Sequence, residues 1–283
     1  MNSLLRLGTS TVSADSSAGT LAPGWAPAEE YLSEYATQFD SIEVDCTFYR
    51  LPPISAIRSW YSHTPNDFLF TAKFPRKITL EKVLLNCEAE LTEFLKAMDG
   101  LGEKLGPLLL QFGYFSKKAL EVNEFLARLV PFLKNLPRDH RFAVEIRNRN
   151  WLIPEFVEAL RERGVALVLV DQMAMPKSSQ WFQNFDPITA DFTYVRWVGD
   201  RKGIEEWTKI WDHIMIDRSR ELSEWVEVLR AVHNRNVQIL AFAHNHYAGN
   251  APGTIEEFRK LWSESDKGAR TFVASMGAGS SVR

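Results

Sequence analysis

Cysteine is scarce in this chain of 283 residues, which contains only Cys46 and Cys87. Two cysteines cannot build the disulfide framework of a small secreted protein, and both stand among apolar residues, so we expect buried free thiols in a reducing compartment. No window approaches the ~18 consecutive apolar residues of a membrane span. The apolar run at residues 4–7 is also too short for a signal peptide. These absences predict a soluble, cytoplasmic protein.

Strong net charge is missing as well, because the formal charge is −3 and the isoelectric point is about 6.1. A chain of this charge has no overall field that would attract nucleic acid or an anionic membrane, although a local basic patch is compatible with it. No glycine-rich phosphate loop follows the first predicted strand, and there is no HExxH motif. The chain therefore lacks the usual signatures of dinucleotide binding and of zinc proteases.

Apolar residues are abundant, at 45% of the chain, and 12% of the residues are aromatic. A chain of this length buries about 75% of its unfolded surface, so one large core can form without disulfide bonds or structural metals. Barrels of alternating strands and helices often span ~250 residues as a single unit. We expect one domain over residues 1–267, followed by a disordered Gly-, Ser- and Ala-rich tail over residues 268–283.

Residues 141–151, RFAVEIRNRNW, show the pattern that recurs along the chain. Phe142, Val144 and Ile146 alternate with Ala143, Glu145 and Arg147, which indicates a strand with charge at its carboxyl end. A polar loop and a helical segment follow. Similar patterns predict eight strands, at residues 4–7, 41–46, 68–73, 107–112, 142–147, 165–171, 192–198 and 237–243.

Segments with helical spacing of three and four residues separate most of these strands. One such helix is expected from Leu84 to Met98, and another is expected to be capped by Ser116. The first strand is expected to run into a turn at residues 8–10. Strands that alternate with helices must be parallel. The predicted fold class is therefore α/β, as a single-domain (β/α)₈ barrel of the TIM type, and an open doubly wound sheet is the alternative.

Polar residues stand at the carboxyl ends of nearly every predicted strand, where barrels of this kind place their working groups. They include four carboxylates, three cations and several other polar residues. The carboxylates are Glu43, Asp45, Glu145 and Asp171; the cations are Lys73, Arg147 and Arg196; the others are Tyr49, Gln111, His244, Asn245 and His246. Most are expected to point into the mouth of the barrel.

The four carboxylates and three cations have a structural explanation and a functional one. They could neutralise one another as buried ion pairs inside the barrel. So many desolvated charges are costly unless the cavity is wet or liganded, which favours a binding cavity. The three cations could converge on a phosphate or carboxylate. Glu145 with Glu43 or Asp45 could instead form the acid/base pair of a glycoside hydrolase.

A metal site is the third chemical alternative. Glu145, Asp171, His244 and His246 offer oxygen and nitrogen ligands. The two cysteines, however, are not spaced for zinc, and the ligands form no recognised metal motif. We assign no metal ligands and no cofactor from the sequence.

Several longer motifs stand in a fixed order: LGTS, SIEVDCTFYRLPP, FTAKFPRKIT, LGPLLLQF, FAVEIRNRNW and YVRW, at residues 7–10, 41–53, 70–79, 105–112, 142–151 and 194–197. Asn245 follows, with Gly249, Ala251 and Pro252 after it. In this order and spacing the chain resembles the YecE-like family of uncharacterised TIM-barrel proteins (domain of unknown function 72). The resemblance implies a barrel and no settled activity.

The resemblance selects as site residues Tyr49, Arg50, Lys73, Gln111, Glu145, Arg147, Arg196 and Asn245. The chain departs from the family pattern at Thr11, Leu80, Gly113 and His244, where Gly, His, Pro and Asn are usual. These departures lie at the predicted barrel mouth, where they bear on whether the ligand is the one that typical members bind.

The functional prediction is an enzyme, a hydrolase or a lyase, that acts on a phosphorylated or otherwise anionic substrate such as a nucleic acid or a sugar phosphate. Lys73, Arg147 and Arg196 are expected to hold the anion, and Glu145 to serve as general base or metal ligand. Gln111 and Asn245 would orient the substrate. A non-catalytic barrel that binds a small ligand or nucleic acid, and a carboxylate-pair glycoside hydrolase, are the alternatives. The sequence points to no protein partner.

Overall fold

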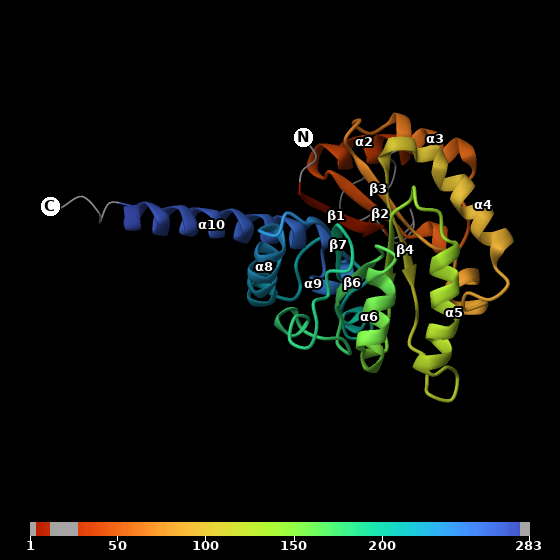
Figure 1. The fold of residues 1–283 in the computed structure, drawn as a ribbon. Coiled ribbons are helices and arrows are strands. Elements are labelled where there is room, and N and C mark those ends of the chain that lie inside the picture. The colour runs from red at the N-terminus through yellow and green to blue at the C-terminus, as the bar shows by residue number, and fades with distance from the viewer. Residues whose placement is uncertain (1–3, 12–27, 278–283) are drawn as a thin grey trace.

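The structure, a computed structural model, describes residues 4–11 and 28–277. Eight parallel strands pair in chain order and close into a barrel, which confirms the predicted fold class (Figure 1). The strands are β1 (Leu5–Thr11), β2 (Ser41–Val44), β3 (Leu69–Lys73), β4 (Leu105–Gln111), β5 (Phe142–Glu145), β6 (Ala166–Asp171), β7 (Phe192–Trp197) and β8 (Gln238–Ala243). Most of the predicted loop at residues 11–26 lies outside the described residues.

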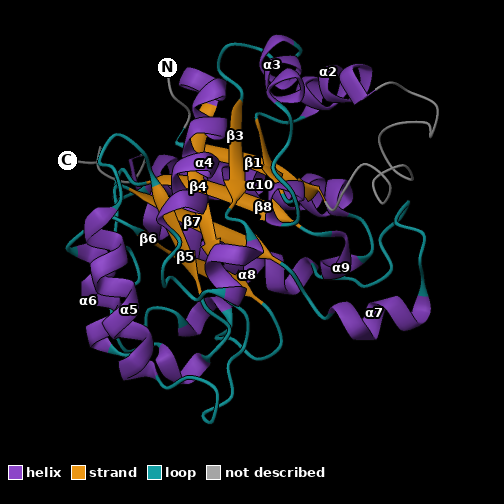
Figure 2. Cartoon of the chain, turned by 90° about the vertical axis from the view of Figure 1, so that its right-hand side faces the viewer, coloured by secondary structure: helices purple, strands orange, loops and turns teal. Residues whose placement is uncertain are grey.

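Helices surround the barrel, and α5 and α6 lie side by side against it (Figure 2). The helices are α2 (Ala28–Gln38), α3 (Ile54–Ser62), α4 (Glu88–Met98), α5 (Val122–Asn135), α6 (Pro154–Arg161), α7 (Arg201–Trp207), α8 (Ser219–His233), α9 (Asn245–Ala248) and α10 (Ala251–Gly277). Helices of this kind bury one apolar stripe against the sheet. In α8 that stripe is Leu222, Trp225 and Leu229, each at most 1% exposed.

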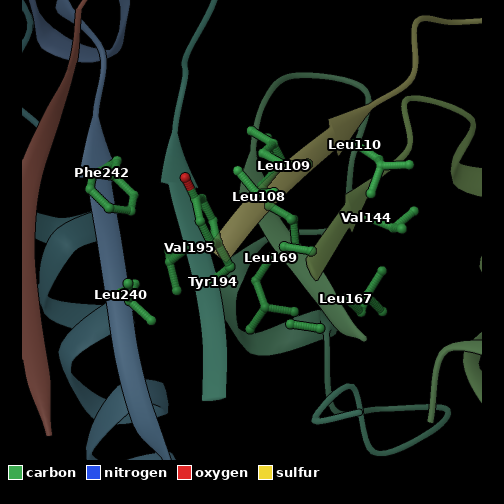
Figure 3. Close-up of a cluster of buried hydrophobic side chains, with 14 of the residues drawn as sticks. Leu108, Leu109, Leu110, Val144, Leu167, Leu169, Tyr194, Val195, Leu240 and Phe242 are labelled. Carbon is green, nitrogen blue, oxygen red and sulfur yellow. The ribbon is translucent and has the colours of Figure 1, made fainter. Parts of the chain in front are cut away.

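The strands are buried on both faces, as a parallel sheet under helices requires. Figure 3 shows part of this core, where Leu108, Leu169, Val195 and Leu240 from four different strands lie in one apolar cluster. The runs PLLLQF and VALVLVD are apolar at nearly every position for this reason. This apolar core fixes the positions of the strands. The polar residues at their carboxyl ends are therefore held by the barrel wall rather than by loops alone.

Tyr35 of α2 joins the first two strands. Its hydroxyl accepts a hydrogen bond from the Thr9 amide at 2.7 Å and donates to the Ser41 carbonyl at 3.0 Å. Gly8 lies beside Ser41 in the register of β1 and β2, and a Cβ at Gly8 would stand only 2.0 Å from the Ser41 carbonyl oxygen. The two strands approach too closely here for any side chain.

Several element boundaries differ from the predictions, and three of the differences have an identifiable cause or position. The helix expected from Leu84 begins only at Glu88, because Val83 and Leu84 have positive φ angles of 43° and 68° that an α-helix cannot contain. The helix expected after Ser116 begins at Val122. The expected turn at residues 8–10 is part of β1, since the pairing with β2 extends that strand to Thr11.

Helix α10 extends away from the barrel, as Figure 1 shows, and continues to Gly277. Residues 268–277, which were expected to belong to a disordered tail, are therefore helical. The Gly and Ser content of this segment suggested disorder, but its Ala, Arg and Met residues have high helix propensity. Residues 278–283 lie outside the described part, and the domain boundary at 267 stays a prediction. Within the described residues, no helix is long and apolar enough to cross a membrane.

We predict that Gly8→Ala lowers the free energy of unfolding by about 1–3 kcal/mol, because the added methyl group forces β1 and β2 apart. Urea unfolding followed by circular dichroism measures the effect. Gly113→Ala is the matched control, since a Cβ there makes an ordinary contact 3.4 Å from Leu80 Cδ2. Equal stability of the two variants would contradict the close approach at Gly8.

Candidate active site at the carboxyl ends of the strands

Arg196 of β7 is the centre of the polar interior, where its side chain is 1% exposed. It binds Glu43 of β2 through Nε at 2.8 Å and Nη2 at 2.6 Å, and it binds Glu145 of β5 through Nη1 at 2.6 Å. Neither β2 nor β5 is a neighbour of β7 in the sheet, so these contacts cross the inside of the barrel. One guanidinium thereby links three separate parts of the wall, using its rigid fork of donors.

Further polar groups complete the shell of Glu43 and Arg196. The Tyr194 hydroxyl donates to Glu43 Oε2 at 2.7 Å and lies 2.9 Å from the Thr71 hydroxyl. Arg196 Nη2 lies 2.8 Å from His244 Nε2. Because a guanidinium can only donate, His244 must present an unprotonated Nε2 and carry its proton on Nδ1.

Two more ion pairs lie next to this network. Arg147 Nη2 is 2.5 Å from Glu145 Oε1, and Arg147 also donates to the Gln172 side chain. Lys73 Nζ, at the carboxyl end of β3, is 3.3 Å from Asp45 Oδ1. Both lysine and aspartate are 7% exposed. The predicted anion-binding cations are therefore each paired with a carboxylate of the chain.

Burial alone would raise the pKa of Glu43 and Glu145, but the cations around them outweigh it. Arg196 holds the pKa of Glu43 well below its ordinary value, and Arg147 and Arg196 lower that of Glu145. Burial opposes the charge on Arg196, yet Glu145 and Glu43 raise its pKa well above normal. Both carboxylates are therefore ionised at neutral pH. Three carboxylates and three cations balance, as the structural explanation of the sequence pattern expected.

The network does not include every predicted site residue. Asp171 accepts hydrogen bonds from Trp225 Nε1 at 2.8 Å and from the Tyr247 hydroxyl at 3.1 Å, so it faces the helices rather than Arg196. Asn245 Oδ1 accepts from the Ala251 amide at 2.9 Å and so satisfies the first N–H group of α10.

The remaining predicted residues lie closer to solvent. Gln111, at the end of β4, is half-buried and donates to the Phe112 carbonyl at 2.8 Å. Tyr49 is 63% exposed, and Arg50 beside it is also exposed. They follow β2, so both belong to the rim of the mouth rather than to its interior.

Sequence reasoning missed Tyr194, Thr71 and Gln172. Tyr194 stands two residues before Arg196 and Thr71 two residues before Lys73, so each shares a strand face with a charged residue that was identified. That period of two was the available signal. The contact from Gln172 to Arg147 joins two loops, and no local pattern indicates it.

No group of three or more metal-ligating residues is assembled anywhere in the described chain. His246, one of the candidate ligands, points instead to Glu205, with Nε2 and Oε1 3.0 Å apart. Two of the departures from the family pattern are neighbours, since Leu80 packs beside Gly113. Another departure, His244, contacts Arg196 itself.

A sequence profile described as "Protein of unknown function DUF72" matches residues 6–276. The chain belongs to the DUF72 family. This confirms the resemblance drawn from the motifs. The family description assigns no activity, and the function must be argued from the site.

Individual relatives agree with this assignment. The UPF0759 protein YecE of Escherichia coli is 32% identical over 146 residues, which are 50% of this chain and 52% of YecE. The chain thus spans about half the length of this curated relative. The UPF0759 protein YunF of Bacillus subtilis is 22% identical over 265 residues, covering 86% of this chain and 90% of YunF.

Solved structures show the same fold. A DUF72 family protein from Thermotoga maritima superposes with a TM-score of 0.69 at 26% identity, covering 92% of this chain and 99% of the other. A DUF72 family protein from Enterococcus faecalis gives 0.66 at 22% identity, with coverage of 92% and 95%. The second likeness shows the fold alone.

We predict that Arg196→Met destabilises the protein by about 3–5 kcal/mol, because it removes the buried cation that binds both Glu43 and Glu145. Arg235→Met is the matched control. Arg235 forms a bidentate ion pair with Asp186, and both side chains are more than two-fifths exposed. Ion pairs exposed to this extent contribute about 0–1 kcal/mol to stability. Urea denaturation of both variants measures the difference. A loss for Arg196→Met no larger than that of the control would refute the network's structural role.

The stability should also depend on pH through His244. Burial and Arg196 lower the pKa of His244 in the folded protein, so the unfolded chain binds more protons as the pH falls through the ordinary histidine range. The free energy of unfolding should therefore fall from pH 7.5 to 5.5, with a slope of at most about 1.4 kcal/mol per pH unit from this group. In His244→Gln, whose amide oxygen still accepts from Arg196, that fall should be smaller. An unchanged slope in urea titrations would oppose the neutral His244 described above.

Proposed function

We propose that this DUF72 protein is an enzyme that binds a phosphorylated or otherwise anionic substrate, a sugar phosphate or a nucleic acid, at the carboxyl ends of the barrel strands. The observation that carries the proposal concerns the loops around the mouth. Arg50, Lys118 and Arg149 follow β2, β4 and β5, and all three are exposed. Among the described residues none of them has a carboxylate partner. Exposed cations without a carboxylate partner are the groups that bind anions.

The loops after β4 and β5 are held together, which gives two of these cations a defined relation. Asn148 donates to the Phe115 carbonyl at 2.7 Å and accepts from the Phe115 amide at 2.9 Å. The rings of Phe115 and Trp151 also stack, with centroids 5.8 Å apart. Lys118 follows Phe115 by three residues, and Arg149 follows Asn148 directly. A rigid junction supports binding because less conformational entropy is lost when the ligand arrives.

Other cations of the mouth contribute less. Arg76 pairs with Glu81 at 2.9 Å, and Lys77 and Lys82 both bind Glu90, at 2.7 and 2.8 Å. The balanced network beneath the rim adds no net charge. Arg50, Lys118 and Arg149 therefore supply the positive potential that an approaching anion meets.

The carboxylate-pair glycoside hydrolase has less support. That mechanism needs one carboxylic acid with a raised pKa to protonate the leaving group. Arg196 binds both Glu43 and Glu145 and lowers both of their pKa values. The same contacts make Glu145 better suited to position Arg147 and Arg196 than to act as the general base. Asp45 and Lys73, which form no hydrogen bond with Arg196, are the stronger candidates for proton transfer.

The non-catalytic alternative remains distinct in its consequences. A barrel that only binds an anion needs the rim cations but no reactive group. It would bind phosphorylated ligands with salt-dependent affinity and leave them unchanged. Mass spectrometry of the ligand after incubation separates an enzyme from a binding protein.

We expect ribose 5-phosphate or a short single-stranded oligonucleotide to raise the melting temperature, since a ligand at 100 times its dissociation constant adds about 2.7 kcal/mol of stability. In Lys118→Ser/Arg149→Ser the dissociation constant should rise at least about tenfold through lost charge-assisted contacts. The control Lys134→Ser/Arg138→Ser removes the same charge from exposed positions before β5, at the opposite end of the barrel, and should change the dissociation constant less than about twofold. Equal effects of the two double variants, or no shift with either ligand, would contradict the proposal.

A further inference from the structure

The barrel buries two lysines, one at each end. Lys73 is the last residue of β3 and is 7% exposed, whereas Lys104 directly precedes β4 and is 2% exposed. Because all strands are parallel, Lys73 lies at the carboxyl ends, where barrel enzymes act, and Lys104 at the opposite end. Their surroundings differ in a way that bears on their chemistry.

Lys104 has the contacts of a structural lysine. Its Nζ donates to the Tyr61 carbonyl at 2.5 Å, to the Thr64 carbonyl at 2.7 Å and to the Thr64 hydroxyl at 3.2 Å. An ammonium group has three hydrogens, so these acceptors satisfy it. Nothing remains for a ligand to contact.

Lys73 Nζ has fewer acceptors around it than Lys104 Nζ has. Its Nζ has one polar contact among the described residues, the 3.3 Å ion pair with Asp45, and the Phe48 ring lies 4.1 Å away on another side. An ammonium group with one carboxylate and one ring as neighbours has donor capacity that no described side chain uses. A site that receives a substrate explains this arrangement.

The charges around Lys73 come from every side of the interior. Burial lowers the pKa of Lys73, Asp45 opposes that shift, and Arg196 adds to it, while Glu145 and Glu43 act in the same sense as Asp45. The pKa of Lys73 therefore lies below that of an ordinary lysine. A larger fraction of the amine is therefore unprotonated and nucleophilic at neutral pH.

The position of Lys73 is also rigid. The Thr47 hydroxyl donates to its carbonyl oxygen at 2.7 Å, and the next residue, Phe74, donates through its amide to Leu109 of β4 at 2.8 Å. The residue pairs with Leu109 in the sheet. A reactive group held by the barrel wall keeps its geometry better than one on a free loop.

We propose that Lys73 is a covalent nucleophile that condenses with the aldehyde or ketone group of the substrate to form a Schiff base, with Asp45 as its proton carrier. The nature of the anionic part rests on the proposed function, whereas the reactivity of the amine does not. The substrate class is thus narrowed to anionic carbonyl compounds, such as open-chain sugar phosphates.

The step balances without an added reagent. The neutral Nζ attacks the carbonyl carbon, a C–N bond forms, and the carbonyl electron pair moves to oxygen. Asp45 takes a proton from nitrogen and returns it to that oxygen, which gives a carbinolamine. Asp45 then takes the second proton from nitrogen and passes it to the hydroxyl oxygen. The nitrogen lone pair forms C=N while the C–O bond breaks, and the oxygen leaves as water, which gives the neutral imine.

The test is reductive trapping on the full chain with glyceraldehyde 3-phosphate and sodium cyanoborohydride, followed by peptide mass spectrometry that counts the label at each lysine. Lys73 should be labelled at least about tenfold faster than the exposed Lys209 and than Lys104. Lys73→Arg should abolish the fast label, and Lys209→Arg should leave it unchanged. Because Lys73→Arg could fold poorly, the comparison of sites within the unmodified protein is decisive by itself.

Uncharged glyceraldehyde separates this proposal from the proposed function. If both aldehydes label Lys73 rapidly and equally, the nucleophile is supported and the anion-binding proposal fails. If phosphorylated ligands raise the melting temperature but Lys73 is labelled no faster than Lys209 by either aldehyde, the anion proposal stands and the Schiff-base proposal is overturned.

Discussion

The ion pairs of Arg196 are the interaction on which the polar interior depends. A guanidinium that is 1% exposed is tolerated only if carboxylates meet its donors, and Glu43 and Glu145 do so from two other strands. The same contacts fix both carboxylates in the ionised state. Arg196 thus determines the charge, the protonation and the orientation of the groups beneath the mouth, and it links strands that do not touch within the sheet.

In the mouth, the charged groups at the centre are fully paired with one another, whereas those at the margin have fewer partners. The carboxylates of the centre have little freedom to exchange protons. At the margin, Lys73 has a single carboxylate partner, and Arg50, Lys118 and Arg149 carry charge that no described carboxylate neutralises. Chemistry that needs a proton or a lone pair is therefore more readily placed at Lys73 and Asp45 than at Glu43 and Glu145.

The fold was predictable because its signals are local and repeated. Alternation and short apolar runs locate all eight strands, since a strand buried by helices must be apolar on both faces. Boundaries were less accurate where the backbone overrides the side-chain pattern. Leu84 fits a helical period, yet its positive φ keeps it out of α4.

The site was predictable only in part. Position at a strand end identified Arg196 and its two glutamates, but it did not show which partners each side chain would choose. Asp171 accepts hydrogen bonds from the Trp225 indole and the Tyr247 hydroxyl, and Asn245 accepts one from the first amide of α10. Those choices depend on packing between distant segments, which the sequence pattern does not encode locally.

The most direct test of the central claim is a ¹³C NMR titration of the glutamate carboxyl groups, with Glu43→Gln and Glu145→Gln used to assign the two buried signals. Arg196 is expected to keep both groups ionised, so neither signal should titrate from pH 7 to the ordinary glutamate pKa of about 4.3 while the barrel stays folded. A midpoint above that value for either carboxyl in the folded protein would contradict the account.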